Sequence, residues 1–280
     1  MGEMKRIFTY LAASAVLFTV LSASVQAQTA VSSTAGEVAQ IDIMPGWRNG
    51  AGEHMAALRI RLAEGWKTYW RAPGDTGIPP SLDWQGSGNV AQVQFHWPVP
   101  DVFVTDGVRT IGYKHELILP MTITPRDAKA PMNLTGELQL GVCRDVCLPV
   151  QADLVAALPA IGSGPDRQIK SALRRRPDTA REAGVKHAIC TMEPIKDGLR
   201  VVTEIQMPRL SADEVVVLET TDPSVWVSEV QTRREGARLI AITELVPSTS
   251  GAFVLNRADI RLTVLGGGGR GVDIRGCSGS

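Results

Sequence analysis

Hydrophobic and polar residues alternate along most of the chain. In MAALRIRLAEG, Leu58, Ile60 and Leu62 fall on one side of an extended segment, and Arg59 and Arg61 fall on the other. The same alternation runs through VQFHWP, ELILPMTIT and NLTGELQLGVC. Because successive side chains of a strand point to opposite faces, this pattern predicts strands that each bury one face of a sheet. Many short strands separated by Gly, Pro, Asp and Asn predict a β-sandwich or barrel.

A polar and basic stretch at 161–184 interrupts the alternation, which resumes in DEVVVLE, RLIAITEL and DIRLTVLGG. We therefore predict an all-β protein of two sandwich domains, at 28–160 and 185–280, joined by a linker at 161–184. A short helix is expected in the linker near Arg167 to Arg175, and its arginines are typical of a solvated face. The run GGGGR at 266–270 precedes no helix, which favours a hairpin loop over a phosphate-binding loop.

The N-terminus has the pattern of a secretory signal. Lys5 and Arg6 precede the apolar run IFTYLAASAVLFTVL, and Val25 and Ala27 occupy the small-residue positions of a cleavage site. We interpret residues 1–27 as a cleaved signal peptide, with an uncleaved membrane anchor as the alternative. The run is short for a bilayer span, which needs about 20 residues. We therefore expect an exported protein without stable membrane insertion after cleavage.

The composition and net charge argue against some classes of protein and of partner. The 280 residues are 44% hydrophobic and 21% charged, which is typical of globular proteins and not of disordered or fibrous ones. The formal net charge is zero, so there is no electrostatic reason to expect nucleic acid or an anionic membrane as a partner. Export also affects how the four cysteines are interpreted, because an oxidising compartment favours disulfides.

Spacing favours two disulfides, Cys143 with Cys147 and Cys190 with Cys277, among the three pairings that four cysteines allow. Strand parity places Cys143 and Cys147 on the polar side of their strands, so both sulfurs are expected to project away from the core. The intervening residues, Arg144 to Val146, are expected to form a hairpin loop.

The small ring closed by Cys143 and Cys147 adds only about 2 kcal/mol of stability in the loop-entropy model, which favours a labile redox pair. A structural clip remains an alternative. A soft-metal site for Cu(I) is another, although His96 and His115 show no metal-ligand spacing and we expect no metal. The ring of about 90 residues closed by Cys190 and Cys277 adds about 4–5 kcal/mol, which favours a structural disulfide over a second redox pair.

Three stretches together resemble a known family: GWKTYWRAPGDTGIPPSLDW, HWPVPDVFVTDGVRTIGYKHELILPMTITP and GVCRDVCLPV. They are similar to the N-terminal periplasmic domain of the thiol:disulfide interchange protein DsbD, and closer to the suppressor-of-copper-sensitivity branch, ScsB. The resemblance covers roughly residues 35–160. The second domain and its cysteines match more loosely.

The resemblance implies an immunoglobulin-like sandwich and a periplasmic protein-disulfide reductase without a cofactor. Its hairpin cysteines would carry reducing equivalents from a membrane or thioredoxin-like donor to periplasmic thioredoxin-fold proteins. Cys147 would form the mixed disulfide with a partner, and Cys143 would resolve it. Because the chain ends without a membrane electron conduit, we expect the donor to be a separate protein. A binding or adaptor module with a permanently closed disulfide, and a copper-handling protein, remain the alternative functions.

The resemblance also implies surroundings for the site. A cap loop at about Pro98 to Tyr113 would shield the cysteines, with Phe103 as the covering ring and Asp101 and Asp106 as nearby acids. An aromatic segment would lie beneath the site, formed by Trp66, Tyr69 and Trp70, with ordinary core packing as the alternative. The classical domain has a wider gap between its cysteines, so its partner specificity is not carried over.

Overall fold

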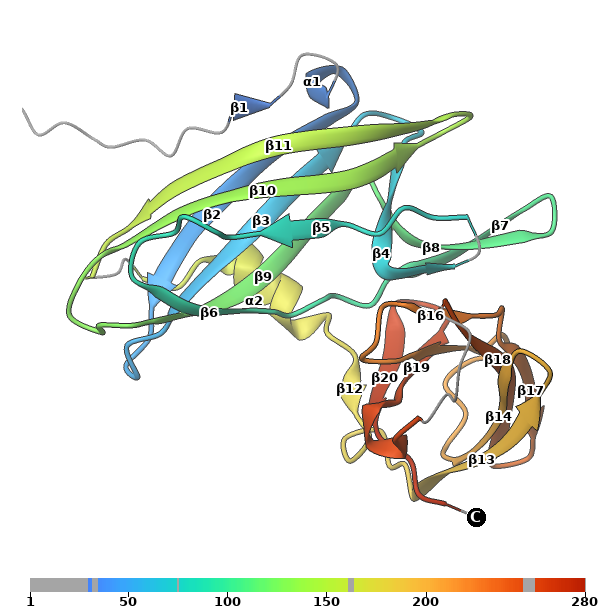
Figure 1. The fold of residues 1–280 in the computed structure, drawn as a ribbon. Coiled ribbons are helices and arrows are strands. Elements are labelled where there is room, and N and C mark those ends of the chain that lie inside the picture. Colours follow the sequence, from blue (N-terminus) through green and yellow to red (C-terminus); the bar gives the residue numbers. More distant parts are fainter. Residues whose placement is uncertain (1–29, 32–34, 75, 161–163, 249–254, 280) are drawn as a thin grey trace, which may run out of the picture.

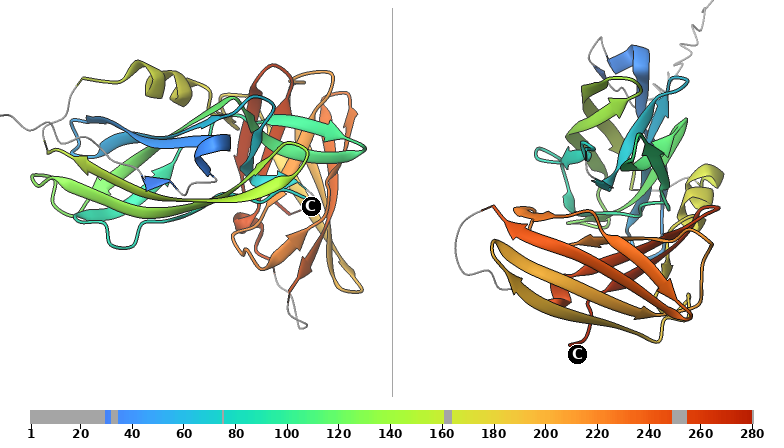
Figure 2. Two further views of the ribbon diagram at one scale, coloured as in Figure 1. Left: turned by 90° about the horizontal axis from the view of Figure 1, so that it is seen from above. Right: turned by 90° about the vertical axis from the view of Figure 1, so that its right-hand side faces the viewer.

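Two β-sandwiches make up the protein, which confirms the all-β, two-sandwich prediction (Figure 1). The computed structural model describes residues 30–31, 35–74, 76–160, 164–248 and 255–279, and the predicted signal peptide lies outside them. The strands of the second sandwich run crosswise to those of the first (Figure 2).

The first sandwich consists of a seven-stranded and a four-stranded sheet. The larger sheet has the order β1-β11-β10-β4-β8-β7, with β5 also paired to β10. Its strands are β1 (Ala30–Val31), β4 (Lys67–Gly74), β5 (Ser81–Asp83), β7 (Asp101–Thr105), β8 (Val108–Lys114), β10 (Met132–Cys143) and β11 (Cys147–Leu158). The smaller sheet has the order β2-β3-β9-β6, and its elements, with the helix that precedes them, are α1 (Ala35–Val38), β2 (Ala39–Arg48), β3 (His54–Leu62), β6 (Val90–Phe95) and β9 (Glu116–Pro125).

The predicted alternation builds the core between these sheets. Leu58 and Ile60 of β3 are buried, and Leu134, Leu138 and Leu140 of β10 are buried opposite them in the same cluster. Burying the apolar face of each strand between two sheets is the main driving force for this fold.

A helix follows the first sandwich. α2 (Arg167–Arg174) begins at Asp166, whose side chain caps it by accepting hydrogen bonds from the backbone N–H groups of Gln168 and Ile169. Ile169 and Ala172 are fully buried in a cluster with residues of the smaller sheet. The helix near Arg167 therefore packs on the first sandwich, while the arginines at 174–176 are exposed.

The second sandwich pairs a sheet of order β12-β20-β19-β15 with one of order β13-β14-β18-β16, in which β17 also pairs with β18. Its elements are β12 (Asp178–Thr179), β13 (His187–Ile195), β14 (Gly198–Gln206), β15 (Val215–Glu219), β16 (Val225–Val227), β17 (Gln231–Glu235), β18 (Arg238–Pro247), η1 (Arg257–Asp259), β19 (Arg261–Gly266) and β20 (Arg270–Arg275). Gly266 pairs with Arg270, which confirms the predicted hairpin loop there.

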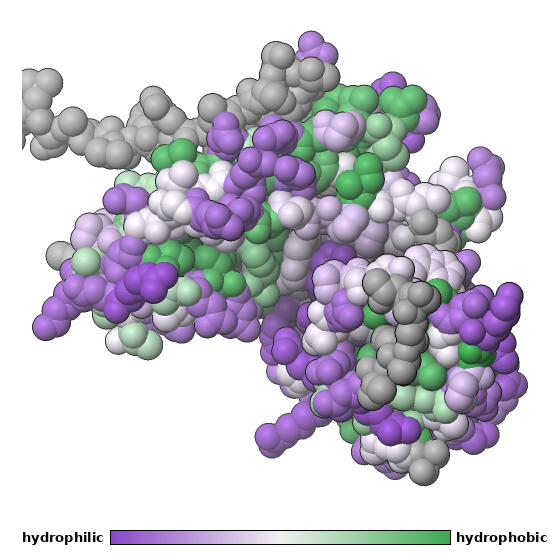
Figure 3. Space-filling model, viewed as in Figure 1, coloured by the Kyte–Doolittle hydropathy of each residue, from purple (hydrophilic) through white to green (hydrophobic). Residues whose placement is uncertain are grey.

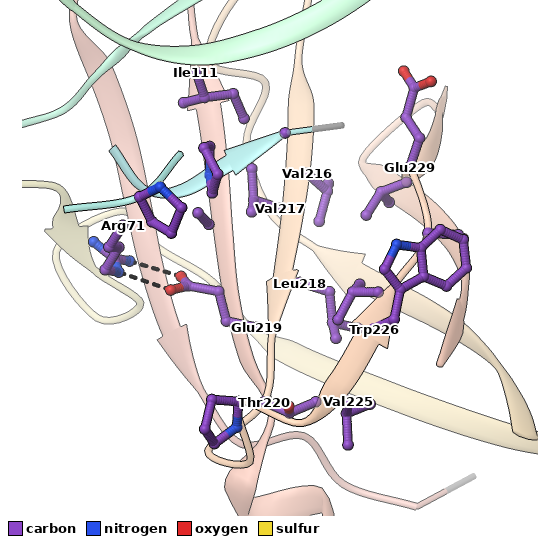
Figure 4. Close-up of a pocket in the computed structure, with 18 of the residues that line it drawn as sticks. Arg71, Ile111, Val216, Val217, Leu218, Glu219, Thr220, Val225, Trp226 and Glu229 are labelled. Carbon is purple, nitrogen blue, oxygen red and sulfur yellow. Dashed lines mark hydrogen bonds and ion pairs between the residues drawn. The ribbon is translucent and has the colours of Figure 1, made fainter. Parts of the chain in front are cut away.

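The two sandwiches meet along β4 and β8. The Arg71 guanidinium donates two hydrogen bonds of 2.9 Å to the Glu219 carboxylate, and Arg109 Nη1 lies 3.0 Å from Glu229 Oε1. Val217 of β15 is buried in the core cluster of the first sandwich. A cavity of about 620 Å³ lies beside this joint, with the Arg71–Glu219 pair on one side and Trp226 on the other (Figure 4).

Cys190 and Cys277 form a disulfide with a Cα–Cα distance of 5.7 Å and a sequence separation of 87. Cys190 is fully buried on β13, and its backbone N–H donates to the carbonyl of Ser278. The bond therefore ties the end of the second sandwich to strand β13.

Replacing both Cys190 and Cys277 with Ala should lower the free energy of unfolding by about 4–5 kcal/mol, because the cross-link closes a long loop in the unfolded chain. Replacing both Cys143 and Cys147 should cost only about 2 kcal/mol, because that loop is short. Urea denaturation of the two double variants measures the difference. Equal losses would contradict this assignment of the stabilising bond.

His54 is expected to make the stability of the folded protein depend on pH. Its ring is buried at the start of β3, with Nε2 2.5 Å from the carbonyl oxygen of Pro45. Burial lowers the pKa of His54 from its ordinary value of 6.5, assisted by the positive charge of Arg48, against the opposing effect of the Pro45 hydrogen bond. The folded protein therefore keeps this imidazole neutral where the unfolded chain takes up a proton.

Because the pKa of His54 is depressed in the folded state, stability should fall as the pH drops below about 6.5. His54→Gln keeps a donor for Pro45 but removes the titration, so its urea midpoint should fall less between about pH 7.5 and about pH 5.5. The exposed His187→Gln is the matched control. An identical pH slope in the wild type and the His54 variant would show that His54 is not responsible.

Candidate redox site

The hairpin of β10 and β11 carries the first pair of cysteines. Cys143 pairs directly with Cys147, and the Arg144 N–H donates to the Val146 carbonyl at 3.1 Å across the turn. The two cysteines form a disulfide with a Cα–Cα distance of 4.1 Å. The hairpin loop predicted from the sequence is therefore present.

The two sulfurs differ in exposure, which the parity argument did not predict. Cys147 is exposed, whereas Cys143 is only 2% exposed. Cys143 does lie outside the core cluster of the first sandwich, as its parity indicates. It is covered because β4 pairs with the end of β10 at Val142 and Cys143, and this pairing brings the Tyr69 side chain over that face of the hairpin.

Tyr69 of β4 is the residue that covers the disulfide. Its Oη donates a hydrogen bond of 3.0 Å to Cys143 Sγ and lies 3.4 Å from Cys147 Sγ. Gly141 makes this approach possible, since a Cβ at that position would lie 3.3 Å from the tyrosine ring and 2.8 Å from Ile78 Cβ. Burial raises the pKa of Tyr69, so the phenol remains a proton donor at neutral pH.

The other two residues of the predicted aromatic segment contact different groups. Trp70 points to the opposite face of β4 and is fully buried in the core of the first sandwich, so core packing accounts for it. Trp66 is half-buried under the guanidinium of Arg144, 5.3 Å from the ring centroid. Of the three, Tyr69 alone has a hydrogen bond to the sulfurs among the described contacts.

The segment predicted as a cap is the hairpin of β7 and β8. Phe103 lies against the ammonium groups of Lys67 and Lys114, which are 5.3 and 4.6 Å from its ring centroid. The acids are both exposed, Asp101 at the start of β7 and Asp106 in the turn at a φ of 51°. Tyr113 belongs to the core, because it is buried, stacks on Trp97 and donates to the Pro98 carbonyl.

The sequence reasoning did not identify Lys67, which is paired with Cys143 on one side and with Lys114 on the other. Its Nζ donates to Thr110 Oγ1 at 2.8 Å. The signal available in the sequence was its position two residues before Tyr69, which puts both side chains on the same face of β4.

Two exposed hydrophobic side chains belong to this region: Val146 precedes Cys147, and Ile78 lies beside Gly141. Val146 is 61% exposed and Ile78 is 43% exposed. Apolar residues reach the surface near the free end of the β10–β11 hairpin (Figure 3). An exposed sulfur with apolar neighbours suits contact with another protein.

Residues 38–159 match the family model described as thiol:disulfide interchange protein DsbD, N-terminal. This segment belongs to the DsbD N-terminal domain family. This match supports a thiol–disulfide interchange role for the domain.

A second finding extends the likeness in fold to both sandwiches. The chain is similar to the crystal structure of the N-terminal periplasmic domain of ScsB from Proteus mirabilis, with a TM-score of 0.63 and 21% identity, covering 94% of this chain and 97% of that one. Comparison with curated proteins gave no match.

None of the described helices is both long and apolar enough to cross a membrane. No group of three or more His, Cys, Asp or Glu residues that could hold a metal ion occurs within the described part of the chain.

Tyr69→Phe should slow reduction of the Cys143–Cys147 disulfide by dithiothreitol by about tenfold, because a hydrogen bond to a charged group contributes about 1.5–3 kcal/mol. The lost donor would otherwise stabilise the Cys143 thiolate as it leaves. Quenching with an alkylating agent and mass spectrometry measure the rate. Tyr113→Phe, which loses a hydroxyl bonded to Pro98 instead, is the matched control. Equal rates for Tyr69→Phe and the wild type would exclude this role.

Proposed function

We propose that this protein is a periplasmic thiol–disulfide exchange module that passes reducing equivalents to thioredoxin-fold partners through Cys143 and Cys147. The observation that carries the proposal is the asymmetry of the disulfide, with Cys147 exposed and Cys143 buried beneath Tyr69. A bond kept only for stability gains nothing from presenting one sulfur to solvent and giving the other a hydrogen-bond donor.

The pair is loaded when a donor thiolate attacks the exposed Cys147 Sγ. A donor–Cys147 disulfide forms, the Cys143–Cys147 bond breaks, and its electron pair stays on Cys143 as a thiolate. The Tyr69 hydroxyl is already directed at that sulfur. The donor's second thiolate then attacks the donor sulfur that is bonded to Cys147, and Cys147 leaves as a thiolate. The donor dithiol is thereby oxidised to a disulfide, and the Cys143–Cys147 pair is reduced.

Delivery reverses these steps. The Cys147 thiolate attacks the disulfide of a partner, and the partner's other sulfur leaves as a thiolate. Cys143 then attacks Cys147 Sγ, which releases the partner as a dithiol and restores the intramolecular disulfide. The exposed Val146 and Ile78 offer apolar contact to the partner during the mixed-disulfide stage.

The periplasm is the compartment that fits this chemistry. The predicted signal peptide directs export, and the similar ScsB structure is that of a periplasmic domain. The electrons would come from a membrane or thioredoxin-like donor, and the activity would be that of a protein-disulfide reductase. The exchange needs no cofactor, because the sulfurs carry both electrons.

Cys143→Ser removes the resolving thiol, so the reduced variant should accumulate a mixed disulfide with an oxidised periplasmic thioredoxin-fold protein. Cys147→Ser should form none, because Cys143 is buried. Non-reducing electrophoresis and mass spectrometry identify the complex and the linked cysteine. If Cys143→Ser traps none of a panel of such proteins, the carrier function is wrong.

A further inference from the structure

A row of four side chains crosses the sheet at the redox site. Cys147 pairs with Cys143, Cys143 pairs with Lys67, and Lys67 pairs with Lys114. Directly paired residues of antiparallel strands lie on the same face, with Cβ atoms about 4.5–5.5 Å apart. Two cations therefore begin on the face that carries the sulfurs, and Lys67 is the immediate neighbour of Cys143.

The ammonium of Lys67 is held in place by contacts with β8 and β7. Its ammonium donates to Thr110 Oγ1, which is buried, and lies against the Phe103 ring. Its side chain is half-buried, and the pKa of Lys67 is lowered first by that burial and then by the charge of Lys114. Among the ion pairs between described residues, none includes Lys67 or Lys114.

An arrangement of this kind costs free energy in the oxidised protein. Two like charges share one aromatic ring, and one of them is partly removed from water. A negative charge that appears nearby offsets that cost. Reduction of the disulfide creates such a charge on Cys143.

We propose that Lys67, supported by Lys114, stabilises the thiolate of Cys143 and so makes the cysteine pair a stronger oxidant towards its electron donor. This inference rests on the proposed exchange function and deepens it. When a donor thiolate bonds to Cys147 Sγ, the electron pair of the broken bond passes to Cys143, the residue that pairs with Lys67 across the β10–β4 ladder. A neighbouring cation favours the thiolate over the thiol, and stabilising the reduced form raises the reduction potential.

Other charged or titratable groups face Cys143 from the elements packed around it. The turn carries a pair that is internally neutralised, with Arg144 Nε 3.0 Å from Asp145 Oδ2. Asp101 of β7 pairs with Gly112 and is separated from Cys143 by two strands. The described groups nearest Cys143 on this face are Lys67, Tyr69, Lys114, Asp101, Arg144 and Asp145. Glu137 and Asp153 pair with each other on the same face, further along the β10–β11 ladder. Lys67 is the cation directly opposite Cys143.

The test uses the protein alone, without a partner. Lys67→Met keeps the aliphatic stem and removes the charge, so the pKa of Cys143 should rise and the equilibrium constant with glutathione should shift about three- to tenfold towards the disulfide. A tenfold shift corresponds to about 30 mV for a two-electron couple. Thiolate absorbance against pH, measured in a Cys147→Ser background, gives the pKa of Cys143.

Two controls separate charge from structure. Lys67→Arg keeps the positive charge and should restore both the pKa of Cys143 and the glutathione equilibrium. Lys129→Met removes an equivalent charge from an exposed position outside the row and should change neither. The effect of Lys67→Met should also shrink as salt is added, because salt screens partly exposed charges.

An unchanged Cys143 titration and an unchanged glutathione equilibrium in Lys67→Met would overturn the proposal, as would failure of Lys67→Arg to restore the wild-type values. These readouts do not depend on a partner. A failed Cys143→Ser trapping experiment would therefore reject the carrier function and leave the electrostatic result standing, and the reverse combination would reject only the role of Lys67.

Discussion

Two residue pairs join β4 to β10: Val142 with Thr68, and Cys143 with Lys67. This short ladder brings a strand from an earlier part of the chain against the end of the redox hairpin. Tyr69, next along β4, can then lie over Gly141 and reach both sulfurs. Without the ladder, the hairpin would present two equivalent, exposed sulfurs. With it, one sulfur is open to attack and the other is buried beneath the Tyr69 hydroxyl, which directs an attacking thiolate to Cys147.

The same strand also ties the site to the second sandwich. Two residues beyond Tyr69, the largely buried Arg71 guanidinium (side chain 13% exposed) lies 3.9 Å from the Trp70 ring centroid and binds Glu219. Breaking such a pair leaves an uncompensated buried charge, so the joint resists displacement. On β8, which pairs with Lys67, Arg109 makes a second contact to Glu229. The strand beside the redox hairpin, β4, and the next strand in the sheet, β8, are therefore both tied to the other sandwich.

The two disulfides illustrate different uses of the same bond. The Cys190–Cys277 bond spans 87 positions and includes a fully buried cysteine, so it removes much freedom from the unfolded chain. The Cys143–Cys147 bond spans only 4 positions and constrains little. Its neighbours are instead groups that can stabilise a thiolate at Cys143, namely the Tyr69 hydroxyl and, as proposed above, Lys67 and Lys114.

The sequence by itself determined the strands and the apolar faces that they bury, as at Leu134, Leu138 and Leu140, because period-two alternation is a local property. It also determined the hairpin that joins the two cysteines, since three residues separate them. It did not determine that Cys143 is buried, that Tyr69 and not Trp70 reaches the sulfurs, or that Lys67 stands in the same row. Those facts depend on which strand lies beside β10 and in which register. That choice is a long-range one, because it is made by the packing of the whole sheet and not by the residues near each cysteine.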